Sequence, residues 1–402
     1  MPVWLDAIPE KAAQIPRPNT RRWLLFLALI MVAGIVLTFW NWSTERTGFV
    51  FWFTALGLPF CLWSLIFSLR RFAYKAAQVG AESRNAAREV LIESEICRGQ
   101  RCAWILGTHI QTIAGNKPSQ LLTAMSQFMP QMDMSQPRGC AIPVRYAALT
   151  EFQKDLPREL KNTVSTLSAC VQNIVELLPQ SIPCWLMLDC DNDIHAQVEE
   201  QLSSELSEKT GRAFRLMAGK GLAAFDLWLD KRWDTPCVLV AVTLALPAAP
   251  QEGDADAITM MMLSNRKAVA FPDALRLHRP ERGTEPTLTK TLNRALLWAK
   301  VQPEQLQGSW FSGTSLAQGS GWNNACEENQ VTFSLTEENV CLDSVLGYAG
   351  HASPWLAIAL AGAVSGERGP QVIAAQPVSD KDDIWITVIT KDEARKESTG
   401  NV

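Results

Sequence analysis

The chain has few of the residues that build a metal or nucleotide site. Its 402 residues include four histidines, which are dispersed and never fall into H-x-x-x-H or mixed Cys/His spacing, so zinc is not favoured. A glycine-rich segment, 309–321, has neither the Lys-Ser/Thr ending of a P-loop nor dinucleotide spacing. The acidic run from Asp189 to Glu200 imitates the ligand spacing of a calcium loop, but Ile194 stands where such a loop needs glycine. We therefore predict neither a metal ion nor a cofactor.

Paired cysteines and a basic surface are missing as well. The ten cysteines include no C-x-x-C pair, and most stand in apolar surroundings, where cysteine behaves as a small hydrophobic residue. The net charge is -4, and no basic stripe is interleaved with aromatic residues. Nucleic acid is therefore not an expected partner.

Charged residues are absent from two long apolar runs, Trp23 to Trp40 and Phe49 to Leu69. Each run is near the ~20 residues that a helix needs to cross a ~30 Å hydrocarbon layer, and only the short stretch 41–48 separates them. The pattern predicts a two-helix transmembrane hairpin over 23–71. Because neither run contains a charged residue, the pattern does not favour an ion path, a proton relay or a transporter subunit.

The flanks of the hairpin predict its orientation. Basic residues gather on the outer sides of the two runs: Arg17, Arg21, Arg22, Arg70, Arg71 and Lys75. By the positive-inside rule both termini face the cytoplasm, with residues 1–22 as a cytoplasmic tail and a bacterial-type inner membrane as the location. A cleaved signal peptide would end its apolar stretch after ~7 to 15 residues, and the first run is longer.

The part of the chain after the hairpin is long enough for a folded domain with its own core. Residues 72–96 are rich in Ala, Glu and Arg, which predicts a juxtamembrane helix. From 97 to 390 helical and strand periods alternate, and strands as hydrophobic as Val238 to Leu246 predict a parallel or mixed sheet covered on both faces. The predicted fold class is α/β, with a flexible charged tail over 391–402.

Three segments of this domain carry a family resemblance. Residues 221–242 resemble a nucleophile-bearing helix that runs into a core strand, and residues 255–263 resemble the strand that follows it. Residues 346–363 are similar to a small-residue turn and a buried helix. Together they resemble the β-ketoacyl synthase and thiolase superfamily over roughly 97–390. The resemblance implies a thiolase-like layered domain.

The resemblance also implies a site whose catalytic residues are mostly replaced. Members of the superfamily acylate a cysteine at a helix N-terminus, but the corresponding turn, 216–220, contains none. The first histidine motif, His-Gly-Thr, reads Ser312-Gly313-Thr314, whereas His351 matches the second motif, Gly-His-Thr. We expect no catalytic residue and a pseudo-active-site groove that survives as a binding pocket. Its predicted residues are Met217, Gly219, Lys220, Ser312, Gly313, Thr314, Gly350 and His351.

The arrangement is also similar to the adaptor proteins, associated with type VI secretion, that load lipase effectors onto the secretion spike. This implies a membrane-anchored, non-catalytic scaffold that binds a secretion effector or a component of the secretion machinery. The alternative is a divergent acyltransferase or condensing enzyme acting on acyl thioesters, with Cys190, Cys237 and Cys326 as candidate nucleophiles. A homodimer is also expected, because thiolase-type folds pair through the nucleophile-bearing half, which here covers Asp234 to Leu246.

Overall fold

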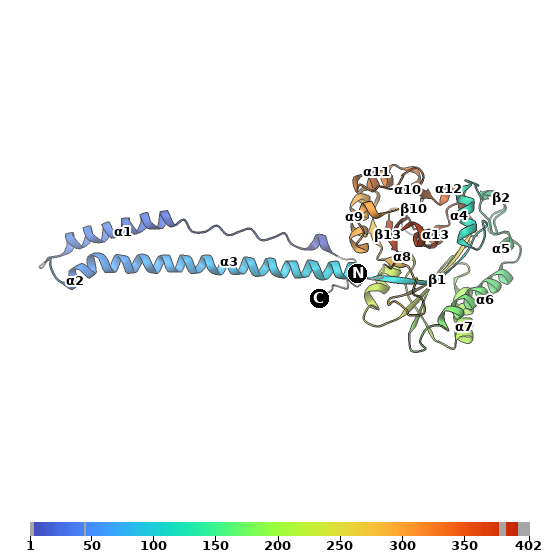
Figure 1. Cartoon of the computed structure of the whole chain (residues 1–402), viewed down its shortest axis with the longest axis horizontal. Helices are drawn as coiled ribbons and strands as arrows, with labels where there is room; N and C mark the ends of the chain where they lie inside the picture. Colours follow the sequence, from blue (N-terminus) through green and yellow to red (C-terminus); the bar gives the residue numbers. More distant parts are fainter. Residues whose placement is uncertain (1–3, 44–45, 378–382, 393–402) are drawn as a thin grey trace, which may run out of the picture. The chain divides into compact units, whose positions relative to one another are not determined.

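The computed structural model describes residues 4–43, 46–377 and 383–392. The described chain forms two compact units, one of residues Trp4–Glu95 and one that begins at Ile96. Figure 1 shows both units, coloured along the sequence. Of the predicted flexible tail, 391–402, only Lys391 and Asp392 lie inside the described residues.

The first unit is a helical hairpin. Its elements are α1 (Thr20–Asn41), α2 (Phe49–Trp52), a π-helical turn (Phe53–Gly57) and α3 (Leu58–Gly99), the last of which runs on into the second unit. Figure 1 shows α1 alongside the first part of α3, and Trp63 Nε1 donates to Trp23 O at 3.0 Å between them. By length and apolar composition, α1 and the helix from Phe49 to Gly99 can each cross a membrane.

The N-terminal segment lies along α3. Ala12 N donates to Asn85 Oδ1 at 2.8 Å, and Arg88 Nε donates to Pro9 O at 2.6 Å. α3 is one unbroken helix over 72–96, where alanine, glutamate and arginine have high helix propensity. The second apolar run and the juxtamembrane segment therefore share one helix.

The second unit is built on a mixed sheet. Its main strands are β1 (Cys102–Gln111), β4 (Cys184–Cys190), β5 (Phe214–Leu216), β6 (Val238–Ala245), β7 (Ala257–Ser264), β8 (Arg276–His278), β10 (Ser309–Ser312), β11 (Asn339–Cys341), β12 (Gln371–Ala375) and β13 (Ile384–Thr390). Their order is β11-β10-β12-β13-β8-β1-β7-β6-β4-β5, and β9 (Glu281–Gly283) pairs with β13 beside this path. A separate hairpin is formed by β2 (Asp133–Ser135) and β3 (Val144–Tyr146).

The two halves of the sheet repeat one topology. In the first half, β5-β4-β6-β7-β1, β4 is parallel to β5 and β6, and β7 is antiparallel to β6 and β1. In the second half, β11-β10-β12-β13-β8, β10 is parallel to β11 and β12, and β13 is antiparallel to β12 and β8. β1 and β8 join the halves as antiparallel neighbours. The chain therefore contains the same five-stranded arrangement twice.

Helices cover both faces of each half. They are α4 (Pro118–Ser126), α5 (Thr150–Lys154), α6 (Leu156–Val175), α7 (His195–Thr210), α8 (Gly221–Lys231), α9 (Leu288–Ala299), α10 (Thr314–Gln318), α11 (Gly321–Glu328), α12 (Asp343–Leu346) and α13 (Ser353–Arg368). The outer cores pack α6 and α7 on the first half and α9 and α11 on the second. α8 and α13 share the inner core, where the Phe225 and Trp355 rings lie 6.4 Å apart. Covered on both faces, β6 and β7 are buried along their whole lengths, as their apolar sequences predict.

Candidate functional site

The N-terminus of α8 forms one wall of the candidate site. The chain enters α8 through Gly219 and Gly221, whose φ angles of 107° and 55° are conformations that glycine adopts without strain. Between them, Lys220 is the N-cap of α8, and its Nζ lies 3.4 Å from Oδ1 of the buried Asp189 at the end of β4. A cation is unfavourable at this end of a helix dipole, and the Asp189 carboxylate compensates for it.

His351 stands at the equivalent place in the second half, in the turn Gly350–Ala352 before α13. α8 lies between β5 and β6, and α13, preceded by the short helix α12, lies between β11 and β12, so the repeated topology relates His351 to Lys220. His351 Nε2 lies 3.0 Å from Leu244 O at the end of β6. Because a carbonyl only accepts, Nε2 donates, and Nδ1 is then the acceptor nitrogen of the neutral ring.

Ser312 orients a buried carboxyl group. Ser312 Oγ donates to Asp343 Oδ1 at 2.6 Å, and Gly313 N donates to Asp343 Oδ2 at 2.7 Å. Burial raises the pKa of Asp343 to about 6, although these two hydrogen bonds act to lower it. Gly313 has a φ of 125°, and a Cβ there would lie 2.4 Å from Gln376 Cβ, so this turn requires glycine.

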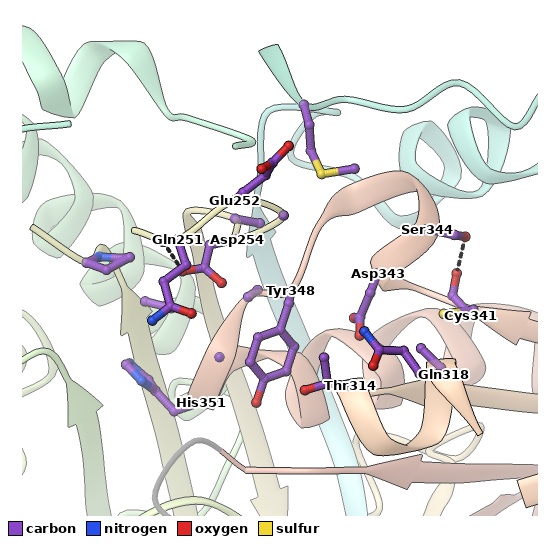
Figure 2. Close-up of a pocket in the computed structure, with 18 of the residues that line it drawn as sticks. Gln251, Glu252, Asp254, Thr314, Gln318, Cys341, Asp343, Ser344, Tyr348 and His351 are labelled. Atoms are coloured by element: carbon purple, nitrogen blue, oxygen red, sulfur yellow. Dashed lines mark hydrogen bonds between the residues drawn. The ribbon is translucent and has the colours of Figure 1, made fainter. Parts of the chain in front are cut away.

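Two adjoining cavities open beside these groups. The larger has a volume of about 720 Å³ and is lined by Thr314, Asp343, Tyr348 and His351, among others. Figure 2 shows Tyr348 in this cavity, with His351 on one side and Thr314 and Asp343 on the other. The smaller, about 400 Å³, is lined by Lys220 and His351 together with Asp189. His351 therefore faces both cavities.

Half of the predicted groove residues line these cavities. Lys220 and His351 line the smaller one, and Thr314, Gly350 and His351 line the larger one. The other predicted residues are not among the described residues that line either cavity: Met217, Gly219, Ser312 and Gly313. The main chain uses some of them, since Met217 N donates to Leu186 O at 2.8 Å.

The sequence analysis missed the acidic residues of the larger cavity. Asp254 and Asp343 both line it, and burial raises the pKa of each carboxyl. Tyr348 lies beside them, and its OH donates to Gln376 O at 2.9 Å. Asp343 is the first residue of the short helix α12. Acidic residues are favoured in the first turn of a helix, and this preference was the sequence signal that could have drawn attention to Asp343.

The acidic run that follows β4 is held by protein partners. Asp189 pairs with Lys220, and Asp191 Oδ2 accepts from Leu246 N at 2.6 Å. Asp193 lies 3.5 Å from Arg138 Nη1. Within the described ranges, no three metal-binding side chains gather in one place.

The three cysteines considered as alternative nucleophiles are buried. Cys190, Cys237 and Cys326 are each at most 1% exposed. Burial raises the pKa of Cys190 to about 12, of Cys237 to about 11 and of Cys326 to about 12. Because the thiolate is the nucleophilic form, these thiols are poorly suited to attack a thioester at neutral pH.

Comparison with known proteins identifies the fold. No family model matches the chain, and no curated protein matches its sequence. A ketosynthase from module 6 of the bacillaene synthase of Bacillus subtilis superimposes with a TM-score of 0.52 and 8% identity over 73% of this chain and 71% of its own. The ketosynthase from module 1 of the bacillaene synthase of Bacillus amyloliquefaciens superimposes with a TM-score of 0.51 and 7% identity, over 74% of this chain and 77% of its own. The chain has a ketosynthase-like fold.

An oxazolomycin ketosynthase domain of Streptomyces albus is similar to the same extent, with a TM-score of 0.50 and 11% identity over 73% of this chain and 76% of its own. The thiolase-like expectation is therefore confirmed for the fold, and identities this low carry nothing about activity. Within the ketosynthase-like fold, the turn that the resemblance assigns to the nucleophile holds Lys220.

Proposed function

We propose that the protein is a membrane-anchored, non-catalytic scaffold whose ketosynthase-like domain binds a protein partner at the cytoplasmic face. The observation that carries this proposal is the pairing of Lys220 with buried Asp189 in the turn before α8, the turn to which the resemblance assigns a nucleophilic cysteine. An ammonium group has no free electron pair with which to attack a thioester. Ser312 stands where the resemblance places the first histidine, and its hydroxyl group donates a hydrogen bond to Asp343. A serine hydroxyl group does not titrate near neutral pH as an imidazole does.

The membrane anchor in this proposal is the α1 and α3 hairpin. Its support is the length and apolar surface of the two helices, the absence of charge inside the runs and the arginines on the outer flanks. The proposed location is a bacterial inner membrane. The resemblance to type VI secretion adaptors suggests an effector or a secretion-machinery component as the partner.

A divergent condensing or acyl-transfer enzyme is the second candidate. The similar solved structures are ketosynthases, so the chain has a fold that such enzymes use, while the fold alone does not give the activity. His351 and the adjoining cavities are where such chemistry would take place. The burial of Cys190, Cys237 and Cys326 and the replaced turn at Lys220 oppose it.

Acylation separates the two candidates. The purified full chain, in detergent, is incubated with an acyl-coenzyme A and with an acyl-loaded carrier protein, and its intact mass is measured. We expect an unmodified mass, because burial raises the pKa of both cysteines that line the described cavities, Cys190 and Cys341. An acyl adduct that maps to a native cysteine would overturn the scaffold proposal and establish the enzyme.

A matched variant, Lys220→Cys, shows whether the cavity still admits an acyl thioester. It places a thiol at the α8 N-terminus, where backbone N–H groups and the helix dipole lower a thiol pKa. An adduct on this variant and none on the native chain would mean that the cavity admits an acyl thioester and that the native chain lacks a nucleophile there. Co-purification after crosslinking in the native host tests the partner, and recovery of an acyl carrier protein in place of a secretion component would contradict the adaptor.

A further inference from the structure

One face of α3 is covered by the chain itself. Along the juxtamembrane part of the helix, the partly buried residues recur with alternating steps of four and three. They are Tyr74, Gln78, Ala81, Asn85, Arg88, Ile92 and Glu95. The N-terminal segment lies on this face through the Ala12–Asn85 and Pro9–Arg88 hydrogen bonds.

The opposite face carries a second stripe with the same alternation of four and three, and this stripe is uncovered. Its members are Leu58, Leu62, Leu65, Leu69, Phe72, Ala76, Val79, Ser83, Ala86 and Val90, all of them exposed. We call this set the heptad stripe. Apolar residues that alternate at four and three mark positions a and d of a coiled coil, where Leu58 is a d position and Leu62 an a position.

The C-terminal part of the heptad stripe, from Phe72 to Val90, lies after the apolar run. Leu58 to Leu69 would face lipid in a membrane, so their exposure alone needs no partner. Phe72, Val79 and Val90 follow the flanking arginines, and their side chains are 75%, 61% and 67% exposed. A helix surface in water normally places charged residues at such positions, so this row favours a second helix.

Gly80 is a separate observation that points to the same face. Glycine inside a helix costs about 0.5–1 kcal/mol relative to alanine. A Cβ at Gly80 would meet no atom within 4 Å, so no contact described in this chain requires glycine there. Gly80 is an e position beside the stripe, and the other e positions of the segment are also small: Ala73, Ala87 and Ser94. Small residues in this row let two helix backbones approach closely.

We propose that the heptad stripe is an interface with a second copy of this chain, in which two α3 helices form a parallel, in-register coiled coil from the membrane-proximal end to Val90. The distribution of charge along α3 favours a second copy of the chain as the partner. In such a pair each g position faces an e position of the other helix, and the g residues Lys75, Glu82 and Glu89 then meet Gly80, Ala87 and Ser94. No like charges oppose one another.

Symmetry favours a second copy as well. Two copies anchored by the same hairpin enter the bilayer in the same direction and at the same depth, so their α3 helices are parallel and level without further adjustment. In the segment Asp234 to Leu246, on which the resemblance placed a dimer, β6 is buried and paired on both sides with β4 and β7, so only residues 234–236 are exposed. The heptad stripe itself is argued from α3, whereas the parallel and level arrangement of the two helices rests on the membrane anchor of the proposed function.

Disulfide crosslinking of the full chain in native membranes tests the interface. In a background with Cys61→Ser and Cys97→Ser, a single new cysteine is placed at the a position by Ser83→Cys or at the neighbouring b position by Arg84→Cys. Both sites are exposed, so neither change disturbs the fold of one chain. Mild oxidation is expected to give a covalent dimer with Ser83→Cys and not with Arg84→Cys. Equal yields, no dimer, or a crosslink to a different protein would overturn the proposal.

A second measurement removes the interface. Val79→Glu with Val90→Glu puts charge at one d and one a position, and the matched control Arg84→Glu with Ala77→Glu puts charge at two exposed b positions. Light scattering in detergent is expected to give a dimer mass for the native chain and the control and a monomer mass for the first variant. A native monomer, or a stripe variant that stays dimeric, would contradict the coiled coil.

Discussion

At the scale of single residues, Asp256 is a buried carboxyl that makes stability depend on pH. It is 1% exposed, and its Oδ2 accepts from Leu149 N at 3.0 Å and from Gln153 Nε2 at 3.4 Å. Burial raises its pKa to about 7, above the value of about 3.9 in an unfolded chain. Between these values the folded protein binds a proton that the unfolded chain has lost. The contribution of Asp256 to the free energy of unfolding is therefore full below about pH 4 and is lost as the pH rises towards 7.

We predict that Asp256→Asn weakens this pH dependence. The side-chain amide oxygen can still accept from Leu149 N, and the amide does not ionise. Each pH unit in the window changes the free energy of unfolding of the native chain by up to about 1.4 kcal/mol through this group. Urea unfolding at pH 5 and at pH 7 measures the difference. The exposed change Asp234→Asn is the control, and an unaltered pH dependence in Asp256→Asn would refute the prediction.

The candidate site could be predicted only in part from single residues. Lys220 and His351 were found because short motifs mark both helix starts, and the structure places both on one cavity. Asp343 and Asp254 were missed because a pKa raised by burial depends on neighbours distant in sequence. Ser312 was predicted to line the groove, but it is not among the described residues that line either cavity, and its hydroxyl group donates a hydrogen bond to Asp343.

At the scale of elements, an ion cluster holds the end of α3 against α8 and β8 within the second unit. Arg98 Nη2 lies 2.6 Å from Asp230 Oδ2, and Arg279 Nη1 lies 2.9 Å from Asp230 Oδ1. Arg279, at 2% exposure, also pairs with Asp226 at 2.6 Å. Burial alone would raise the pKa of Asp230, but hydrogen bonds from Arg98 and Arg279 hold it well below its ordinary value.

Asp230→Asn is expected to destabilise the second unit by about 3 kcal/mol or more, because it leaves the buried guanidinium of Arg279 with one of its two carboxylates. The free energy of unfolding from urea titration gives the value. Asp234→Asn, the same change at a nearby exposed site, should cost little. A loss under about 1 kcal/mol for Asp230→Asn would mean that the cluster does not stabilise the fold.

Elements with long, regular patterns were predicted well, and short buried ones were not. The expected strand Val238 to Leu246 agrees with β6 to within a residue, and the helix expected at the start of 221–242 is α8. The segment 309–321, which the sequence analysis describes only as glycine-rich, contains strand β10, helix α10 and the first residue of α11, because β11 and β12 on either side fix β10 in the sheet.

At the scale of the whole molecule, two native cysteines on α3 report on the proposed membrane. Cys61 lies in the second apolar run and Cys97 near the end of the same helix, and both are exposed. We predict that a membrane-impermeant maleimide labels Cys97 in inverted vesicles and labels Cys61 only after detergent is added, because lipid covers Cys61. Peptide mapping by mass spectrometry identifies the labelled site. Labelling of Cys61 without detergent would contradict the hairpin, and labelling of Cys97 in right-side-out vesicles would contradict the orientation.

The position of β1 at the middle of the sheet has a consequence for biosynthesis. β1 follows α3 directly, yet its two neighbours, β7 and β8, come from much later in the chain. At roughly 5–20 residues per second, the ribosome completes them on the order of ten seconds after β1 emerges. During that interval an apolar strand remains unpaired, and a chaperone that shields it would raise the yield of folded protein.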